Sequence, residues 1–174
     1  MPEPSTRSGA RPLIRWARTA DVKPIRAIVA PMAESRVLIA KEAVTYYEAL
    51  QQFRVAEVAG EVVGCGALHV MWEDLAEIRT LAVLPEAKGS GVGSALLEAL
   101  VGDARDLGVE RLFCLTFEVD FFTRHGFVAI EGRAVDPEVY AELLRSYDVG
   151  VAEFLDLERV KPNTLGNTRM LRQL

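Results

Sequence analysis

Residues 77–107 constrain the fold more than any other part of this 174-residue chain. A strand-like apolar run, "EIRTLAV", is followed by a proline, by the glycine-rich segment "KGSGVG" and by a long run with apolar residues at helical spacing. Gly108 follows that run, and glycine is the usual residue just past a helix C-terminus. The sequence therefore predicts a strand, a glycine loop and a helix in direct succession. The apolar residues expected to be buried in this helix are Val92, Ala95, Leu96, Ala99, Leu100, Ala104 and Leu107.

The glycine spacing excludes two common phosphate-binding loops. A P-loop has its lysine directly after the last glycine, whereas Lys88 precedes the glycines here. The dinucleotide fingerprint needs G-x-G-x-x-G, and Ser94 occupies the place of its third glycine. The segment does match a [QR]-x-x-G-x-[GA] pattern, with lysine in the first place. Successive N–H groups at a helix N-terminus favour a pyrophosphate, and a tight turn without a ligand is the alternative.

The remaining segments alternate between strand and helix patterns. Thr19 is expected to cap a first helix that buries Val22, Ile25, Ile28 and Val29. Gly64 and Gly66 indicate a bulge or a close backbone neighbour within a strand. The mixture predicts one domain of the α/β class, an α+β arrangement in which helices flank a central mixed sheet. Further strands are expected at residues 13–16, 53–58, 111–117 and 150–157, in a long return strand after a turn at Gly60–Glu61, and from Phe127; further helices are expected in "EAVTYYEALQQ", in "VDFFTRHGF" up to Gly126 and near Pro137–Leu144, with a tail "VKPNTLGNTRML".

Composition and charge limit the class of protein. The formal net charge of −5 argues against nucleic acid and anionic membranes as partners. No apolar run reaches the roughly 18 residues needed to span a bilayer, so we expect a cytoplasmic protein. Residues 1–11 are predicted to be a disordered tail ahead of a domain at 12–174. Cys65 and Cys114 lie in apolar runs, which predicts buried thiols rather than a disulfide or a metal site.

At "KGSGVG" the chain resembles the GCN5-related N-acetyltransferases (the GNAT family), which bind acetyl-CoA at this loop. The stretch "EIRTLAVLPEAKGSGVGSALLEAL" is similar to their strand–loop–helix core, and "FFTRHGF" to a terminal signature that usually reads Y-x-x-x-G-F. From Leu13 onward the chain also resembles short bacterial N-acetylglutamate synthases that lack an amino-acid-kinase domain, notably in "GCGALHV", "SYDVGVAEFLDL" and "KPNTLGNTRML". The resemblance implies acetyl transfer from acetyl-CoA to the α-amine of L-glutamate, which begins arginine synthesis.

The resemblance also implies where acetyl-CoA binds, with no metal involved. The pantetheine arm would pair as an extra strand with Leu81, Ala82 and Val83. The pyrophosphate would lie on the glycine loop, where lysine keeps a positive charge without the fork of an arginine. The loop residues implied are Lys88, Gly89, Ser90, Gly91, Val92, Gly93 and Ser94.

Acyl transfer needs a neutral amine, so a base must take the proton of the acceptor ammonium group. Many members of the family place this base, acting through water, at the position of Glu77; Glu73 and Asp74 are nearby alternatives, and a solvent-facing strand end is another. The tyrosine that often protonates the CoA thiolate is replaced by Phe122, which cannot donate a proton. Tyr140 and Tyr147 are the remaining candidates, and no acid is assigned.

For the acceptor, the resemblance implies Lys41, His69, Thr168 and Arg169 as substrate-binding residues. The alternative interpretations are a solvated helix start for Lys41, a core histidine for His69 and a surface charge for Arg169. His125 is interpreted as a helix C-terminal residue. L-Glutamine, a polyamine or a protein N-terminus are alternative acceptors, and a CoA-binding sensor without catalysis is an alternative function. The resemblance further implies a homodimer.

Overall fold

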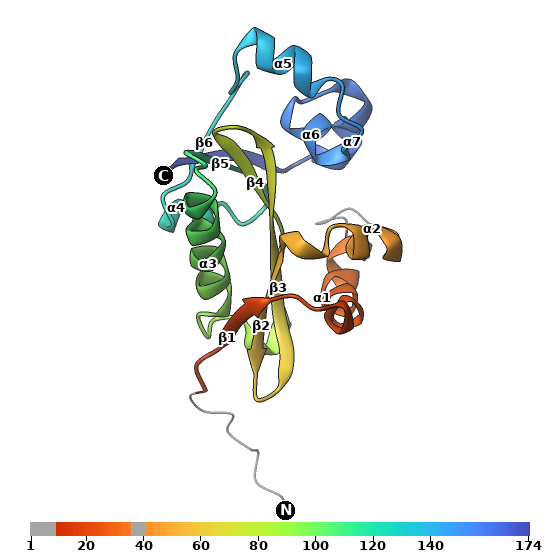
Figure 1. Ribbon diagram of the computed structural model, residues 1–174, viewed down its shortest axis with the longest axis vertical. Coiled ribbons are helices and arrows are strands. Elements are labelled where there is room, and N and C mark those ends of the chain that lie inside the picture. The colour runs from red at the N-terminus through yellow and green to blue at the C-terminus, as the bar shows by residue number, and fades with distance from the viewer. Residues whose placement is uncertain (1–9, 36–40) are drawn as a thin grey trace, which may run out of the picture.

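The computed structural model describes residues 10–35 and 41–174 and shows a seven-stranded sheet in the order β1-β2-β3-β4-β5-β7-β6 (Figure 1). Strands β4 and β5 pair in parallel, and the other neighbours pair antiparallel. This mixed sheet with flanking helices confirms the predicted α/β class. The strands are β1 (Leu13–Trp16), β2 (Phe53–Val58), β3 (Glu61–Trp72), β4 (Leu75–Val83), β5 (Arg111–Thr116), β6 (Val128–Ala129) and β7 (Thr168–Gln173).

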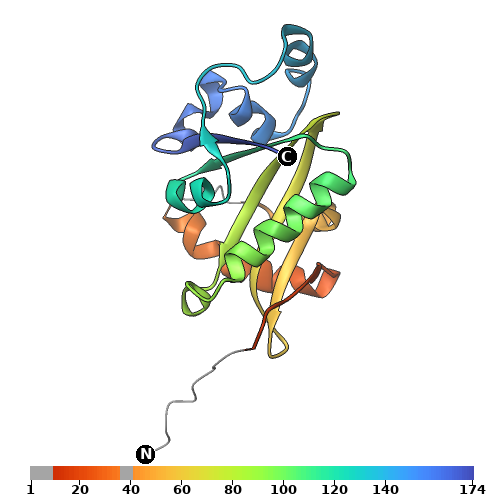
Figure 2. The same cartoon turned by 90° about the vertical axis from the view of Figure 1, so that its left-hand side faces the viewer.

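Helix α3 covers one face of the sheet, and α1 and α2 lie on the other face (Figures 1 and 2). The α-helices are α1 (Val22–Glu34), α2 (Ala43–Glu48), α3 (Val92–Asp106), α4 (Val119–Arg124), α5 (Pro137–Leu143), α6 (Val149–Phe154) and α7 (Lys161–Thr164). Short 3-10 helices are η1 (Thr19–Asp21), η2 (Leu50–Gln52), η3 (Pro85–Ala87) and η4 (Glu158–Val160).

Two glycines of β3 let α3 approach the sheet closely. A Cβ on Gly64 would lie 3.0 Å from Leu96 Cδ1, and one on Gly66 would lie 2.9 Å from Leu100 Cδ1. The register between β3 and β4 also shifts between Cys65 and Ala67. Both predicted reasons for these glycines, a bulge and a close neighbour, are therefore confirmed. Both cysteines are buried free thiols, as expected.

The buried face predicted for α1 is confirmed, but its cap is not Thr19. Thr19 lies inside η1, which precedes α1 directly. The backbone N–H of Arg18 donates to the Asp21 carboxylate at 2.6 Å, and Arg15 holds that carboxylate with two further hydrogen bonds. Asp21 therefore occupies the N-cap position of α1, but its carboxylate is bonded to Arg15 and Arg18 and caps no backbone N–H of α1.

Two turns lie one or two residues from their predicted positions. The β2–β3 turn consists of Ala59 and Gly60, both with positive φ (52° and 84°), so β3 already begins at Glu61. Leu107, predicted to be buried, is 63% exposed. Helix α3 ends at Asp106, and the chain then turns so that Val109 enters the core in place of Leu107.

The largest error of the sequence analysis concerns residues 150–157, which form helix α6 and not a strand. The Asp148 carboxylate accepts a hydrogen bond from the N–H of Val151 at 2.9 Å and so caps this helix. Val151 and Phe154 are buried at helical spacing, and the Phe154 ring packs edge-on against Phe113 with centroids 4.9 Å apart. Packing against the sheet surface therefore favours a helix over a strand in this segment.

The predicted tail "VKPNTLGNTRML" is also structured. It contains η4 and α7 and ends in β7, which lies between β5 and β6 in the sheet. Of the N-terminal tail predicted at residues 1–11, residues 1–9 lie outside the described part of the chain.

The sheet opens between its two parallel strands. Strands β4 and β5 pair only at Leu75–Arg111, Ala76–Leu112 and Glu77–Phe113. Beyond Glu77, β4 continues beside β3 alone, while β5 continues beside β7. One edge of β4 therefore has no neighbouring strand along the stretch that leads to the glycine loop.

Candidate active site

The glycine loop joins β4 to α3 through η3. Gly89 and Gly91 have φ of 76° and 85°, in the left-handed region that favours glycine. A Cβ at either position would meet no atom within 4 Å, and Lys88 and Ser90 are exposed. The conformation thus requires glycine here, and the space beside the loop is open.

The first turn of α3 presents its backbone donors toward this loop. The N–H of Ala95 donates to Gly91 O at 3.0 Å and closes the first turn, so the preceding N–H groups have no acceptor within the helix. Ser90 Oγ donates to Ala87 O at 2.5 Å and closes the loop from the other side. Free donors, the positive helix end and open space together fit a pyrophosphate.

The predicted pantetheine edge lies on the unpaired side of β4. Ala82 is buried, whereas Leu81 and Val83 are half-buried. Ala82 and Val83 pair with Cys65 and Gly64 on β3, which leaves the opposite edge available. An extended ligand can pair with such an edge through backbone hydrogen bonds.

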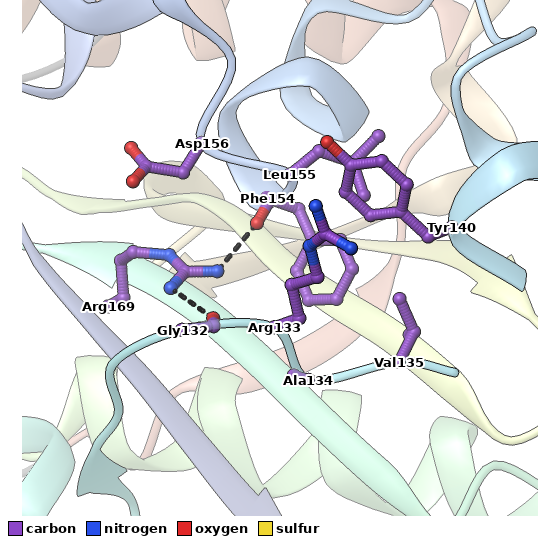
Figure 3. A pocket seen from close by; sticks show the side chains of 9 residues that line it. All are labelled: Gly132, Arg133, Ala134, Val135, Tyr140, Phe154, Leu155, Asp156 and Arg169. Carbon is purple, nitrogen blue, oxygen red and sulfur yellow. Dashed lines mark hydrogen bonds between the residues drawn. The ribbon is translucent and has the colours of Figure 1, made fainter. Parts of the chain in front are cut away.

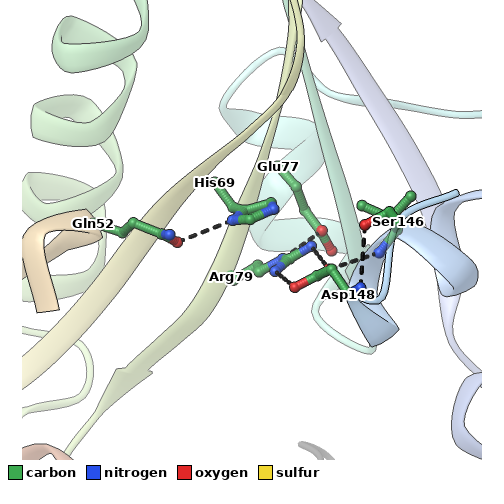
Figure 4. A network of polar contacts seen from close by, with 7 residues as sticks. Gln52, His69, Glu77, Arg79, Ser146 and Asp148 are labelled. Carbon is green, nitrogen blue, oxygen red and sulfur yellow. Dashed lines mark hydrogen bonds and ion pairs between the residues drawn. The ribbon is translucent and has the colours of Figure 1, made fainter. Parts of the chain in front are cut away.

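A buried network of charged side chains lies where β4 and β5 part (Figure 4). Arg79 Nε donates to Glu77 Oε2 at 2.6 Å, and both belong to β4. The two terminal nitrogens of Arg79 donate to the Asp148 carboxylate, ahead of α6, at 2.6 and 3.0 Å. A Cβ on Gly150 would overlap the Arg79 guanidinium, so this glycine lets α6 lie directly against it. We call Glu77, Arg79 and Asp148 the Arg79 network.

Burial raises the pKa of both carboxylates in the Arg79 network, and Arg79 lowers it, but the balance differs between the two. Glu77 is 4% exposed, and desolvation raises its pKa even though Arg79 opposes the shift. For Asp148, desolvation also favours the acid, but the hydrogen bonds and charge of Arg79 lower the pKa to about 2. Asp148 therefore stays ionised, and Glu77 is the member whose proton affinity is increased.

His69 and Lys41 both lie close to this network. His69 is directly opposite Glu77 in the β3–β4 ladder, and its Nδ1 is 3.1 Å from Gln52 Oε1. Desolvation, followed by the nearby Arg79 charge, lowers the pKa of His69. The same two causes lower the pKa of the exposed Lys41, while Asp148 and Glu77 oppose that shift. The structure thus brings three predicted site residues, Lys41, His69 and Glu77, to one place.

Among the described residues, Thr168 and Arg169 share no hydrogen bond with the Arg79 network. Arg169 donates to Gly132 O at 2.9 Å and to Phe154 O at 2.6 Å, and it lines a separate cavity of about 260 Å³ (Figure 3). Two of its guanidinium nitrogens therefore support the backbone of the segment that contains α5 and α6.

The structure also places the candidate acids and the alternative bases. Phe122 is buried against Phe121 and Phe127, so the position of the usual tyrosine is part of the core. Tyr147 is fully exposed, and Tyr140 lies under the Arg133 guanidinium. Glu73 is exposed, Asp74 pairs with Arg111 at 2.9 Å, and His125 ends α4 with its Nδ1 2.8 Å from Phe121 O.

Sequence reasoning missed Arg79, Asp148 and Glu153 as members of the site. A signal for Arg79 was present, because residues two apart in a strand lie on the same face, and Arg79 is two residues from Glu77. No sequence signal links Arg79 to Asp148, which is 69 residues away and precedes a segment that was predicted to be a strand.

Residues 13–127 match the model of the Acetyltransferase (GNAT) family, and the chain belongs to that family. The predicted family is confirmed. Over 164 residues the chain is 57% identical to the amino-acid acetyltransferase of Mycobacterium tuberculosis, covering 92% of this chain and 94% of the relative. Because it covers 92% of the chain, this similarity also includes part of the segment beyond the family match, residues 128–174.

Solved structures agree with this assignment. A crystal structure of a Mycobacterium tuberculosis protein in complex with CoA and NLQ has a TM-score of 0.91 and 56% identity, covering 94% of this chain and 99% of the other. The N-acetylglutamate synthase of Neisseria gonorrhoeae, complexed with coenzyme A and N-acetyl-glutamate, has a TM-score of 0.76 and 25% identity. That match covers 96% of this chain and 36% of the longer Neisseria chain.

Two features are absent from the described residues. They form no helix that is long and apolar enough to cross a membrane. Within the same ranges, 10–35 and 41–174, no group of three or more His, Cys, Asp or Glu side chains is arranged to hold a metal ion.

Proposed function

We propose that this chain is an acetyl-CoA-dependent amino-acid acetyltransferase and that it acetylates the α-amine of L-glutamate, the first step of arginine synthesis. L-Glutamine is the alternative acceptor. The observation that carries the proposal is the position of the Arg79 network at the point where β4 and β5 part, beside the free edge that leads to the glycine loop. The amino-acid acetyltransferase of M. tuberculosis, 57% identical, supports the acceptor class.

The residues predicted to hold acetyl-CoA fit its two parts. The edge of β4 at Leu81, Ala82 and Val83 would pair with the pantetheine arm, and residues 88–94 would bind the pyrophosphate through backbone N–H groups. When bound, acetyl-CoA supplies an activated thioester to the acceptor. The geometry of the strand edge would direct that thioester toward the place where the two strands part.

Glu77 is proposed as the general base, acting through a water molecule. Desolvation raises its pKa toward the range in which a carboxylate accepts protons efficiently at neutral pH. Loss of a proton frees the amine lone pair, the N–C bond forms, and the C–S bond of the thioester breaks. A thiol titrates near pH 8.5, so the CoA thiolate is an adequate leaving group without an acid at Phe122.

Lys41 is proposed to bind a carboxylate of the acceptor. Arg79 is already engaged by Glu77 and Asp148, whereas Lys41 stays exposed beside them. His69 would add a polar contact from the neighbouring strand. Substrate roles for Thr168 and Arg169, a homodimer and a cytoplasmic location remain predictions.

The acceptor is tested by measuring CoA release with a panel of amines. L-Glutamate and L-glutamine should be acetylated with the highest kcat/KM, because each offers an α-carboxylate and a side-chain acceptor to Lys41. Lysine and spermidine serve as matched controls, since they carry an added cation that Lys41 repels. Faster acetylation of either control would contradict the glutamate proposal and leave the family assignment intact.

A further inference from the structure

Glu153 is a buried carboxylate that the mechanism above does not use. It is 7% exposed and lies in α6, three residues after Gly150, so both residues are on the same helical face. Because Gly150 lies against the Arg79 guanidinium, this face points toward the Arg79 network. Glu153 Oε1 has no hydrogen-bond partner among the described residues. Glu77 and Asp148, by contrast, are both bonded to Arg79.

The charges around Glu153 are not balanced. The acidic groups that influence it are Glu77 on β4 and Asp148 at the start of α6; the cations are Arg79 on β4 and Lys41 ahead of α2. His69 on β3 belongs to the same group of side chains. When all carboxylates are ionised, three negative charges face the two cations. A proton on Glu153, or a cation from outside, removes the excess.

We propose that Glu153 is the group that holds the proton released by the acceptor amine, an inference that rests on the proposed function. The N–H bond of the acceptor ammonium breaks, and the proton passes through water and Glu77 to the Glu153 carboxylate. The free amine then forms the N–C bond as the C–S bond breaks. The second proton lost by the nitrogen goes to the CoA thiolate, and Glu153 returns its proton to solvent.

The two carboxylates differ in a way that fits this division of roles. Arg79 lies 2.6 Å from Glu77 and stabilises its ionised form, so Glu77 passes a proton on. Glu153 has no such partner, and desolvation together with the charge of Glu77 raises its pKa to about 7. Because Arg79 is bonded to Glu77 and no described group donates to Glu153 Oε1, the negative charge is better stabilised on Glu77 and the proton is placed on Glu153.

The test compares Glu153→Gln, Glu77→Gln and an exposed control, Glu158→Gln, in the full chain. The wild-type kcat/KM for the acceptor should rise with pH and level off above about pH 7, because Glu153 must be ionised to take the proton. Glu153→Gln should move this acidic limb to the pH range in which the base Glu77 titrates, and it should lower the plateau about tenfold or more. The rise in Tm caused by acetyl-CoA should stay as in the wild type. Glu158→Gln should change neither property.

Thermal unfolding of the ligand-free protein gives a readout that is independent of activity. The folded-state pKa of Glu153 lies above its unfolded value, so folding favours the acid; its stabilising effect is present at low pH and is lost as pH rises through about 7. The Tm advantage of Glu153→Gln over the wild type should therefore grow between pH 5.5 and 8.5. Glu153→Asp, which keeps the carboxylate, should restore the acidic limb of the wild type, and it serves if the glutamine variant does not fold.

The outcomes separate this inference from the proposed function. An unchanged acidic limb in Glu153→Gln overturns the role of Glu153, even where Glu77→Gln has lost most of its rate and the proposed base stands. Full activity of Glu77→Gln would instead overturn the proposed base and, with it, the route of the proton to Glu153.

Discussion

The glycine loop follows strand β4, and two members of the Arg79 network, Glu77 and Arg79, belong to that strand. The two regions are nevertheless built in opposite ways. The loop is one contiguous segment that presents backbone donors to open space, with two glycines in left-handed conformations. The network is buried and joins charged side chains from β4 and from the start of α6, far apart in the sequence. A contiguous site can be recognised in a sequence, whereas a site joined by folding cannot. The two sites should also respond differently to substitution.

The largest effect is expected from Arg79→Met, which leaves the buried Glu77 and the half-buried Asp148 without their partner. Removing one member of a buried ion pair costs about 3–5 kcal/mol, so the free energy of unfolding in urea should fall by roughly that amount at pH 7. Arg145→Met is the matched control, because Arg145 pairs with Glu142 on the surface. Such exposed pairs contribute about 1 kcal/mol or less. Equal losses in both variants would show that the network does not stabilise the fold.

An intermediate effect is expected from Gly91→Ala, and it should appear in ligand binding. Gly91 and Gly108 have φ of 85° and 82°, and a Cβ on either would meet no atom within 4 Å. Both substitutions to alanine should therefore cost a similar 1–2 kcal/mol or so of stability. Only Gly91→Ala should also weaken acetyl-CoA binding, by about tenfold, because one charge-assisted backbone contact is worth roughly 1.5–3 kcal/mol. The increase in Tm with acetyl-CoA concentration measures this difference, and equal increases would place the pyrophosphate elsewhere.

The smallest effect is expected from Lys41→Ala, because Lys41 is exposed and its removal leaves no buried partner unpaired among the described residues. The KM for L-glutamate should rise by about tenfold, at the lower end of the cost of a charge-assisted bond, while acetyl-CoA affinity is unchanged. Lys161→Ala is the control, since this lysine pairs with Asp156 on the surface. The same KM for both variants would remove Lys41 from the acceptor site.

The variant Arg169→Ala tests whether this arginine supports the fold or binds the acceptor. Because Arg169 donates to two backbone carbonyls, its removal should lower the Tm. An increased KM for the acceptor at an unchanged Tm would instead support the predicted substrate role.

The sequence by itself determined the half of the molecule in which local pattern and tertiary environment agree. The strand from Glu77, the glycine loop and helix α3 follow from a strand-like apolar run, from closely spaced glycines and from a period-3.6 run within one segment. The family, the class of the fold and the location of the loop all follow from this segment. Glu77 itself was identifiable because it lies in the same motif.

The tertiary structure alone decided the environment of that residue. Residues 150–157 are apolar enough for either a strand or a helix, and the cap at Asp148 together with packing against Phe113 selects the helix. The same cap residue also binds Arg79, so the helix and the buried ion network form together. Pairing energies between distant charges depend on separation and desolvation, which exist only after the chain has folded. For that reason the sequence could name a carboxylate of the candidate site, while only the fold could show which charged groups surround it.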